Sequence, residues 1–88
     1  MNVLIVGAGQ VGESIAADLA TDHDVTVVDA RSDRTEELAY GYDVLTVTGD
    51  GTSIEVLEEA GIESAEMVIA STDDDETNIV VCSTAAAL

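Results

Sequence analysis

The stretch NVLIVGAGQVG, residues 2–12, decides the fold of this chain. Its first five residues form an apolar run, which is typical of a strand buried on both faces of a parallel sheet. GAGQVG then fits the pattern G-x-G-x-x-G, whose glycines permit a tight turn, a close approach of pyrophosphate, and close packing of helix on strand. Val11, Ile15 and Leu19 recur every fourth residue and place one apolar stripe on a helix over about residues 10–20.

The rest of the chain alternates short β-branched runs with longer amphipathic ones, which is typical of parallel strands joined by crossover helices. Further strands are expected at residues 25–28, 44–48 and 67–70, with helices between them and over residues 78–88. We therefore predict an α/β fold, a doubly wound parallel sheet of the Rossmann type in three αβα layers, as a single nucleotide-binding domain over residues 1–88. Because a crossover helix should lead to a fifth strand, we expect this domain to be truncated after the fourth strand and the following helix.

Two capping boxes predict where the middle helices begin. Asp33 with Glu36 marks the start of the second helix. Thr52 with Glu55 marks the start of the third, which should end before Gly61.

A carboxylate closes the second predicted strand. Asp29 follows Gly9 by about 20 residues, where a carboxylate can accept hydrogen bonds from ribose hydroxyls. Its charge disfavours a 2′-phosphate, although Arg31 and Arg34 could also receive one. The glycines alone would fit a structural turn without ligand, but strand, helix and carboxylate together favour a nucleotide. Because ATP, ADP, NAD and NADH all share the adenosine and its phosphates, these residues do not discriminate among them.

The charge balance excludes several classes of partner. The chain carries 19 acidic residues against two arginines and no lysine, for a formal net charge of -17. Since Lys and Arg supply most affinity for nucleic acids and anionic membranes, neither is an expected partner. No apolar stretch reaches the roughly 18 residues of a membrane span, so we expect a cytoplasmic module without direct membrane insertion. Such acidity resembles that of halophile proteins, because molar salt screens the self-repulsion.

Four motifs, GAGQVG, VVDARSDR, TGDGT and ASTDDDETN, follow one another along the chain. With them the chain resembles, over residues 1–88, the amino-terminal RCK or KTN (TrkA-N) domain of Trk-type potassium uptake regulators. The resemblance implies a Rossmann fold that forms dimers or higher homo-oligomers and responds to NAD(H), ATP or ADP. It also implies a membrane-embedded potassium transporter or channel subunit as partner, and hence a position at the inner face of the cell membrane.

Carried over by position, the resemblance implies a set of nucleotide contacts. Phosphates would lie against the glycine loop, the adenosine against the second and third motifs, and the distal phosphate or nicotinamide near DETN. The implied contacts are Gly7, Ala8, Gly9, Gln10, Val11 and Gly12, then Asp29, Ala30, Arg34, Gly49 and Asp50, and finally Thr72, Asp75, Glu76 and Asn78. NAD or NADH is the expected cofactor, with ATP or ADP as the alternative. Without the resemblance, the acidic run at 73–76 would be a solvated helix cap.

Functions from different classes fit these features. The favoured one is a regulatory subunit that senses a nucleotide and controls potassium transport. The alternative is the cofactor half of an NAD-dependent dehydrogenase, which the fold alone does not exclude, and a third is an oligomerisation piece with a vestigial pocket. A chain with no lysine and one histidine, His23, offers few groups for hydride-transfer chemistry. We therefore expect that the chain is not an enzyme and that it has no catalytic residue and no metal site.

Overall fold

The computed structural model describes residues 1–70 as alternating strands and helices. The elements are β1 (Asn2–Val6), α1 (Gln10–Leu19), β2 (Asp24–Asp29), α2 (Ser32–Gly41), β3 (Leu45–Thr48), α3 (Ile54–Glu59), the 3-10 turn η1 (Ile62–Ser64) and β4 (Met67–Ala70). All four predicted strands and the first three predicted helices are present, with ends that differ by a few residues at most. The helix expected over residues 78–88 lies outside the described residues.

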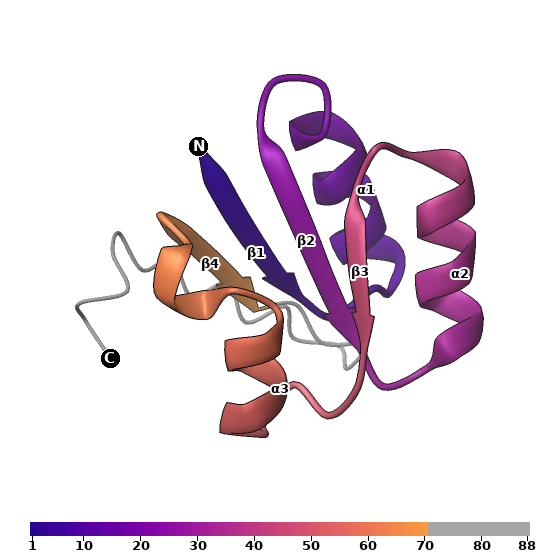
Figure 1. Ribbon diagram of the computed structural model, residues 1–88. Helices are drawn as coiled ribbons and strands as arrows, with labels where there is room; N and C mark the ends of the chain where they lie inside the picture. Colours follow the sequence, from indigo (N-terminus) through magenta and orange to yellow (C-terminus); the bar gives the residue numbers. More distant parts are fainter. Residues whose placement is uncertain (71–88) are drawn as a thin grey trace.

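The strands form one parallel sheet in the order β3-β2-β1-β4 (Figure 1). Helices α1 and α2 pack on one face of this sheet, and α3 with η1 packs on the other. The chain runs from β1 outward to β3 and then crosses to β4 on the far side of β1. The predicted Rossmann-type α/β fold is therefore confirmed, and its strand order reverses beside the carboxyl end of β1, where such sheets bind ligands.

The core consists of aliphatic side chains that alternate between the two faces. On β1, Val3 and Ile5 belong to the cluster under α1 and α2, whereas Leu4 belongs to the cluster under α3. On β2, Val27 and Val28 divide in the same way. A strand covered on both faces needs apolar residues at every position, which explains the continuous run at the start of the chain.

The predicted capping box at the start of α2 is wrong. The helix begins at Ser32 after its N-cap residue Arg31, whose side chain makes no cap hydrogen bond. Asp33 instead lies in the first turn and accepts hydrogen bonds from the Arg31 guanidinium at 2.8 and 3.2 Å. The Arg31 guanidinium binds the Asp33 carboxylate, which the capping box would have needed as its cap. In the turn before the helix, Asp29 Oδ1 accepts a hydrogen bond from the Arg31 amide.

The predicted capping box at the start of α3 is also wrong, by one residue. Ser53 is the N-cap, and its hydroxyl accepts a hydrogen bond from the Val56 amide at 3.5 Å. Thr52 lies one residue before the cap, where its amide and its hydroxyl donate to the Asp50 Oδ1 at 2.8 and 2.7 Å. The predicted end of the helix is confirmed, since Gly61 follows it with a left-handed φ of 89°.

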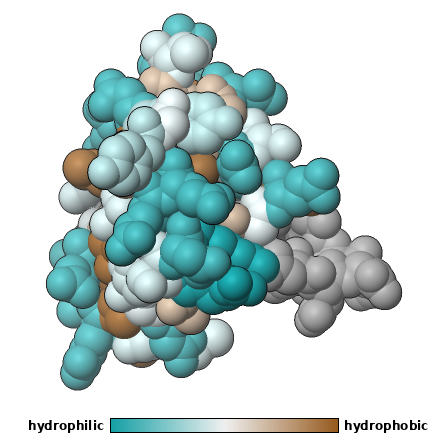
Figure 2. Space-filling view, turned by 90° about the vertical axis from the view of Figure 1, so that its right-hand side faces the viewer, coloured by the Kyte–Doolittle hydropathy of each residue, from teal (hydrophilic) through white to brown (hydrophobic). Residues whose placement is uncertain are grey.

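The surface on the side of α2 is mainly hydrophilic (Figure 2). Exposed acids on this helix include Asp33, Glu36 and Glu37. Within residues 1–70, every helix is too short or too polar to cross a bilayer.

Candidate functional site

The glycine loop between β1 and α1 depends on its first and third glycines. Gly7 has a φ of 110°, in the left-handed region that side chains disfavour, and its amide donates to the Val28 carbonyl at 2.7 Å. A Cβ on Gly12 would lie 2.0 Å from the Gly7 carbonyl oxygen. The helix can therefore start directly against the loop only because residue 12 lacks a side chain.

Asp29 joins this loop to the turn that follows β2. Its Oδ2 accepts a hydrogen bond from the Ala8 amide at 2.7 Å, and its Oδ1 accepts one from the Arg31 amide at 2.8 Å. The Asp29 side chain is only 10 % exposed, and the Arg34 guanidinium lies 3.8 Å from Oδ2. Each oxygen of an ionised carboxylate can accept a further hydrogen bond, so Asp29 retains capacity for a ribose hydroxyl.

The amino end of α1 is a second feature that suits a nucleotide. No side chain caps this helix at Gly9, and its first bond runs from the Glu13 amide to the Gly9 carbonyl at 2.8 Å. Within the described part of the chain, the amides of Gln10 and Val11 consequently have no acceptor. Free amides and the positive end of the helix dipole favour an anion such as a phosphate.

A groove of about 490 Å³ opens at the carboxyl edge of the sheet. It brings together residues from the ends of β1, β2 and β4, from the start of α2, and from the β3–α3 turn. The lining residues are Val6, Gly7, Val28, Asp29, Ala30, Arg31, Arg34, Gly51, Thr52 and Ala70. We call this hollow the carboxyl-edge groove; it lies at the position where the strand order reverses.

The structure places the predicted contacts in three groups. Gly7, Asp29, Ala30 and Arg34 line the carboxyl-edge groove together. Ala8 is buried and bonds Asp29, whereas Gly9, Gln10, Val11 and Gly12 form the start of α1 beside the groove. The predicted contacts Thr72, Asp75, Glu76 and Asn78 lie outside the described residues. Each assignment to a ligand stays a prediction.

In the β3–α3 turn, the second glycine of TGDGT lies at the groove, and the nucleotide contacts predicted for Gly49 and Asp50 stay predictions. Gly51 and Thr52 line the groove, and Gly49 and Asp50 do not. A Cβ on Gly49 would lie 2.9 Å from Val56, so this glycine packs beneath α3. A Cβ on Gly51 would lie 2.4 Å from a Val6 methyl, which shows how closely the turn passes over the end of β1. The motif TGDGT predicted where the turn lies. That Gly51, its second glycine, packs against Val6 is visible only in the structure.

Asp50 provides a test of the turn by pH. Hydrogen bonds from Thr52, first from its backbone amide and then from its hydroxyl, hold the pKa of the Asp50 carboxyl below its usual 3.8. A lowered pKa in the folded state means that this stabilisation is present above 3.8 and is lost as the pH falls through the lower value. We expect carboxyl-carbon NMR to give a midpoint below 3.8 for Asp50, and the Thr52→Val variant to raise it. A midpoint at or above 3.8 in the parent chain would contradict this geometry.

A pair of threonine hydroxyls, one of them buried, joins the start of α2 to the end of β3. Thr35 on α2 is 2 % exposed; its hydroxyl donates to the Ser32 carbonyl at 3.1 Å and lies 2.7 Å from the Thr48 hydroxyl at the end of β3. The pair thereby links the start of α2, which carries Arg34, to the strand that leads into the β3–α3 turn.

We expect Thr35→Val to lower the free energy of unfolding by about 1–2 kcal/mol, because it keeps the shape but loses both hydrogen bonds. Thr35→Ser should retain most of the stability. Adding Thr48→Val to Thr35→Val should cost less than Thr48→Val alone, since the partner hydroxyl is already gone. Urea unfolding of the four variants checks this, and strictly additive costs would show that the two hydroxyls are not coupled.

The fold, the uncapped helix above a glycine loop, and the buried carboxylate at the end of β2 define a domain of the Rossmann nucleotide-binding class. More particularly, the chain belongs to the TrkA-N domain family, whose model matches residues 3–88.

Curated relatives share this domain. The chain is 46% identical over 86 residues to the Trk system potassium uptake protein TrkA of Halomonas elongata, which covers 97% of this chain and 19% of that protein. The protein of the same name from Vibrio alginolyticus is 43% identical, with the same coverage of each chain. A TrkA homolog from Methanothermobacter thermautotrophicus is 40% identical over 93% of this chain and 38% of its own length. The chain therefore spans about a fifth of the two bacterial relatives.

Proposed function

We propose that this chain is a regulatory module that binds an adenine nucleotide, NAD(H) or ATP/ADP, and controls potassium transport through a membrane partner. The observation that carries the proposal is the double hydrogen bond of Asp29 to the Ala8 and Arg31 amides. These two bonds place the Asp29 carboxylate between the glycine loop and the start of α2, the helix that carries Arg34. Membership in the TrkA-N family, with relatives named for potassium uptake, supports the transport role.

The geometry supports an unphosphorylated ribose. A 2′-phosphate beside Asp29 would meet a carboxylate. Of the two arginines at this groove, Arg34 lies 3.8 Å from Asp29 itself, and Arg31 is paired with Asp33 at 2.8 Å. The Arg31 guanidinium, chiefly through its side-chain hydrogen bond, holds the pKa of the Asp33 carboxyl below its usual 3.8. We therefore propose that NAD or NADH binds more tightly than its 2′-phosphorylated form.

Regulation requires that the nucleotide bind one conformation better than another. The glycine loop, the α2 start and the β3–α3 turn converge on the carboxyl-edge groove, and a ligand that bridges all three would favour the arrangement in which they are close. The module would act in the cytoplasm at the inner face of the membrane, as a homodimer or larger ring.

Calorimetric titration tests this proposal. We expect ADP, ATP, NAD and NADH to bind the folded chain in molar potassium chloride, and the 2′-phosphorylated dinucleotide to bind at least tenfold more weakly. The near-ultraviolet absorbance of NADH should stay constant during incubation, because a sensor leaves its ligand unchanged. Failure of every nucleotide to bind the folded chain would contradict the proposal, and turnover of the nicotinamide would instead support the cofactor half of a dehydrogenase.

A further inference from the structure

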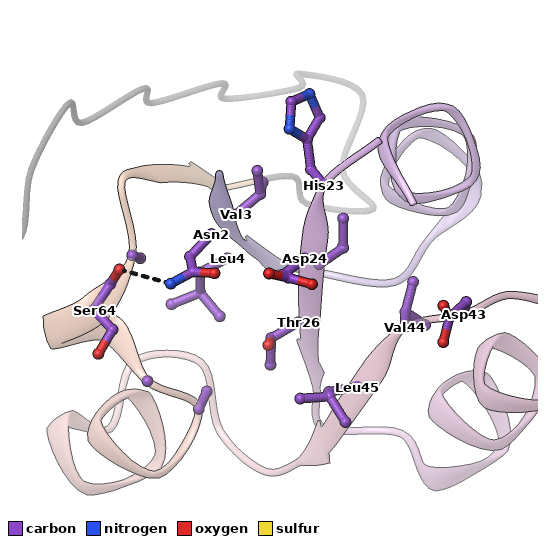
Figure 3. Close-up of a pocket in the computed structure, with 14 residues that line it drawn as sticks. Asn2, Val3, Leu4, His23, Asp24, Thr26, Asp43, Val44, Leu45 and Ser64 are labelled. Carbon is purple, nitrogen blue, oxygen red and sulfur yellow. Dashed lines mark hydrogen bonds between the residues drawn. The ribbon is translucent and has the colours of Figure 1, made fainter. Parts of the chain in front are cut away.

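A second hollow, of about 380 Å³, lies at the opposite edge of the sheet, where the strands begin (Figure 3). We call it the amino-edge groove. Its wall on one side is formed by the ends of α3 and η1, where the Asn2 side chain donates to the Ser64 carbonyl at 3.4 Å. Leu4, Thr26 and Leu45 come from three adjacent strands and lie toward the side of α3 (Figure 3). The nucleotide-binding residues proposed above do not line this groove.

The apolar part of this groove is incompletely covered. Leu4 is buried, but Leu45 on β3, one of the two edge strands of the described sheet, is 73 % exposed. A leucine exposed beside a hollow, rather than on a convex surface, offers contact area that a partner side chain can cover.

The charged part of the groove is acidic. Asp24 and Asp43 line it, and neither carboxylate forms an ion pair within the described residues. Both arginines lie at the other edge of the sheet. The groups that could carry positive charge at this edge, within residues 1–70, are His23, whose ring points away from the other labelled side chains in Figure 3, and the amino group of Met1. Crossover helices also end at this edge, so their dipoles add partial negative charge.

We propose that the amino-edge groove docks a basic, partly apolar segment of a partner protein. The aliphatic stem of a lysine or arginine would cover Leu45, and its charged end would meet Asp24 or Asp43. Cytoplasmic segments of membrane proteins carry an excess of Lys and Arg, so this chemistry fits the membrane partner, and to that extent the inference rests on the proposed function. Docking here leaves the carboxyl-edge groove open for the nucleotide.

The test is an NMR titration of the isotope-labelled chain with a synthetic 12-residue peptide of alternating lysine and leucine. We expect amide shifts to concentrate around Asn2, Asp24, Leu45 and Ser64. Leu45→Ser should weaken peptide binding at least fivefold, and so should the double variant Asp24→Asn with Asp43→Asn. Matched controls are Ile54→Ser, which removes an aliphatic side chain of similar exposure, 71 %, and Asp18→Asn with Asp22→Asn, which removes the same charge elsewhere.

Shifts spread over the whole acidic surface, or equal weakening by the control variants, would overturn the docking site. Self-association of the chain through Leu45 without peptide binding would overturn it as well. Titrating ADP into the same variants separates the two proposals. Peptide docking without nucleotide binding would refute the proposed nucleotide sensor alone, and nucleotide binding without localised docking would refute the groove alone.

Discussion

Replacing Gly12 by alanine should destabilise the domain by about 3 kcal/mol or more, among the largest effects of any single methyl group in this chain. The added Cβ would lie 2.0 Å from the Gly7 carbonyl oxygen and 3.1 Å from its carbonyl carbon. Both are backbone atoms, so the overlap can be relieved only by moving α1 away from the end of β1. Thermal and urea unfolding measure the loss, and nucleotide affinity should fall with it because the first amides of α1 move too.

Gly41→Ala is the matched control for this substitution. Gly41 is the last residue of α2, and a Cβ there would meet nothing within 4 Å. The same change should therefore leave stability unchanged or raise it by about 0.4–1 kcal/mol, because alanine restricts the unfolded chain. Equal destabilisation by the two variants would show that contact with Gly7 is not the reason for glycine at position 12.

Replacing Asp29 by alanine should weaken adenine-nucleotide binding roughly 10- to 100-fold, since the ribose loses an acceptor that is charged. The variant also loses the bonds to the Ala8 and Arg31 amides, so the loop and the α2 start are no longer held together. Calorimetry in molar potassium chloride measures the affinity, and circular dichroism establishes that the variant is folded.

Asp33→Ala is the control for the change in charge. Asp33 also carries a carboxylate near the groove, but its side chain is 62 % exposed and its ion pair is with Arg31. It should bind nucleotide about as well as the parent. An unchanged affinity in Asp29→Ala, or an equal loss in Asp33→Ala, would refute the assignment of Asp29 to the ribose.

The sequence predicted those parts of the site that depend on local chemistry. A continuous apolar strand, three glycines and a helical stripe specify the loop without reference to the rest of the chain, and Asp29 follows at the distance that one βαβ unit imposes. The structure adds the bonds from Asp29 to Ala8 and Arg31, which link residues up to 21 positions apart.

Other parts could not be predicted because nearby groups compete for the same partners. Asp50 accepts hydrogen bonds from the amide and the hydroxyl of Thr52, which holds Thr52 one residue before the helix cap, and Arg31 binds the carboxylate of Asp33. In so acidic a chain the capping pattern is weak evidence, because carboxylates are common near every helix start. The roles of Gly51 and Leu45 depend on which strands lie beside one another, and a single sequence does not reveal that order.

The most direct test of the account is to locate bound ADP by intermolecular nuclear Overhauser effects in the saturated complex. If ADP binds in the carboxyl-edge groove, we expect contacts from its ribose and adenine protons to the methyl groups of Val6, Ala30 and Thr52. Contacts to Leu4 and Leu45 instead would place the nucleotide at the opposite edge of the sheet and contradict the central claim.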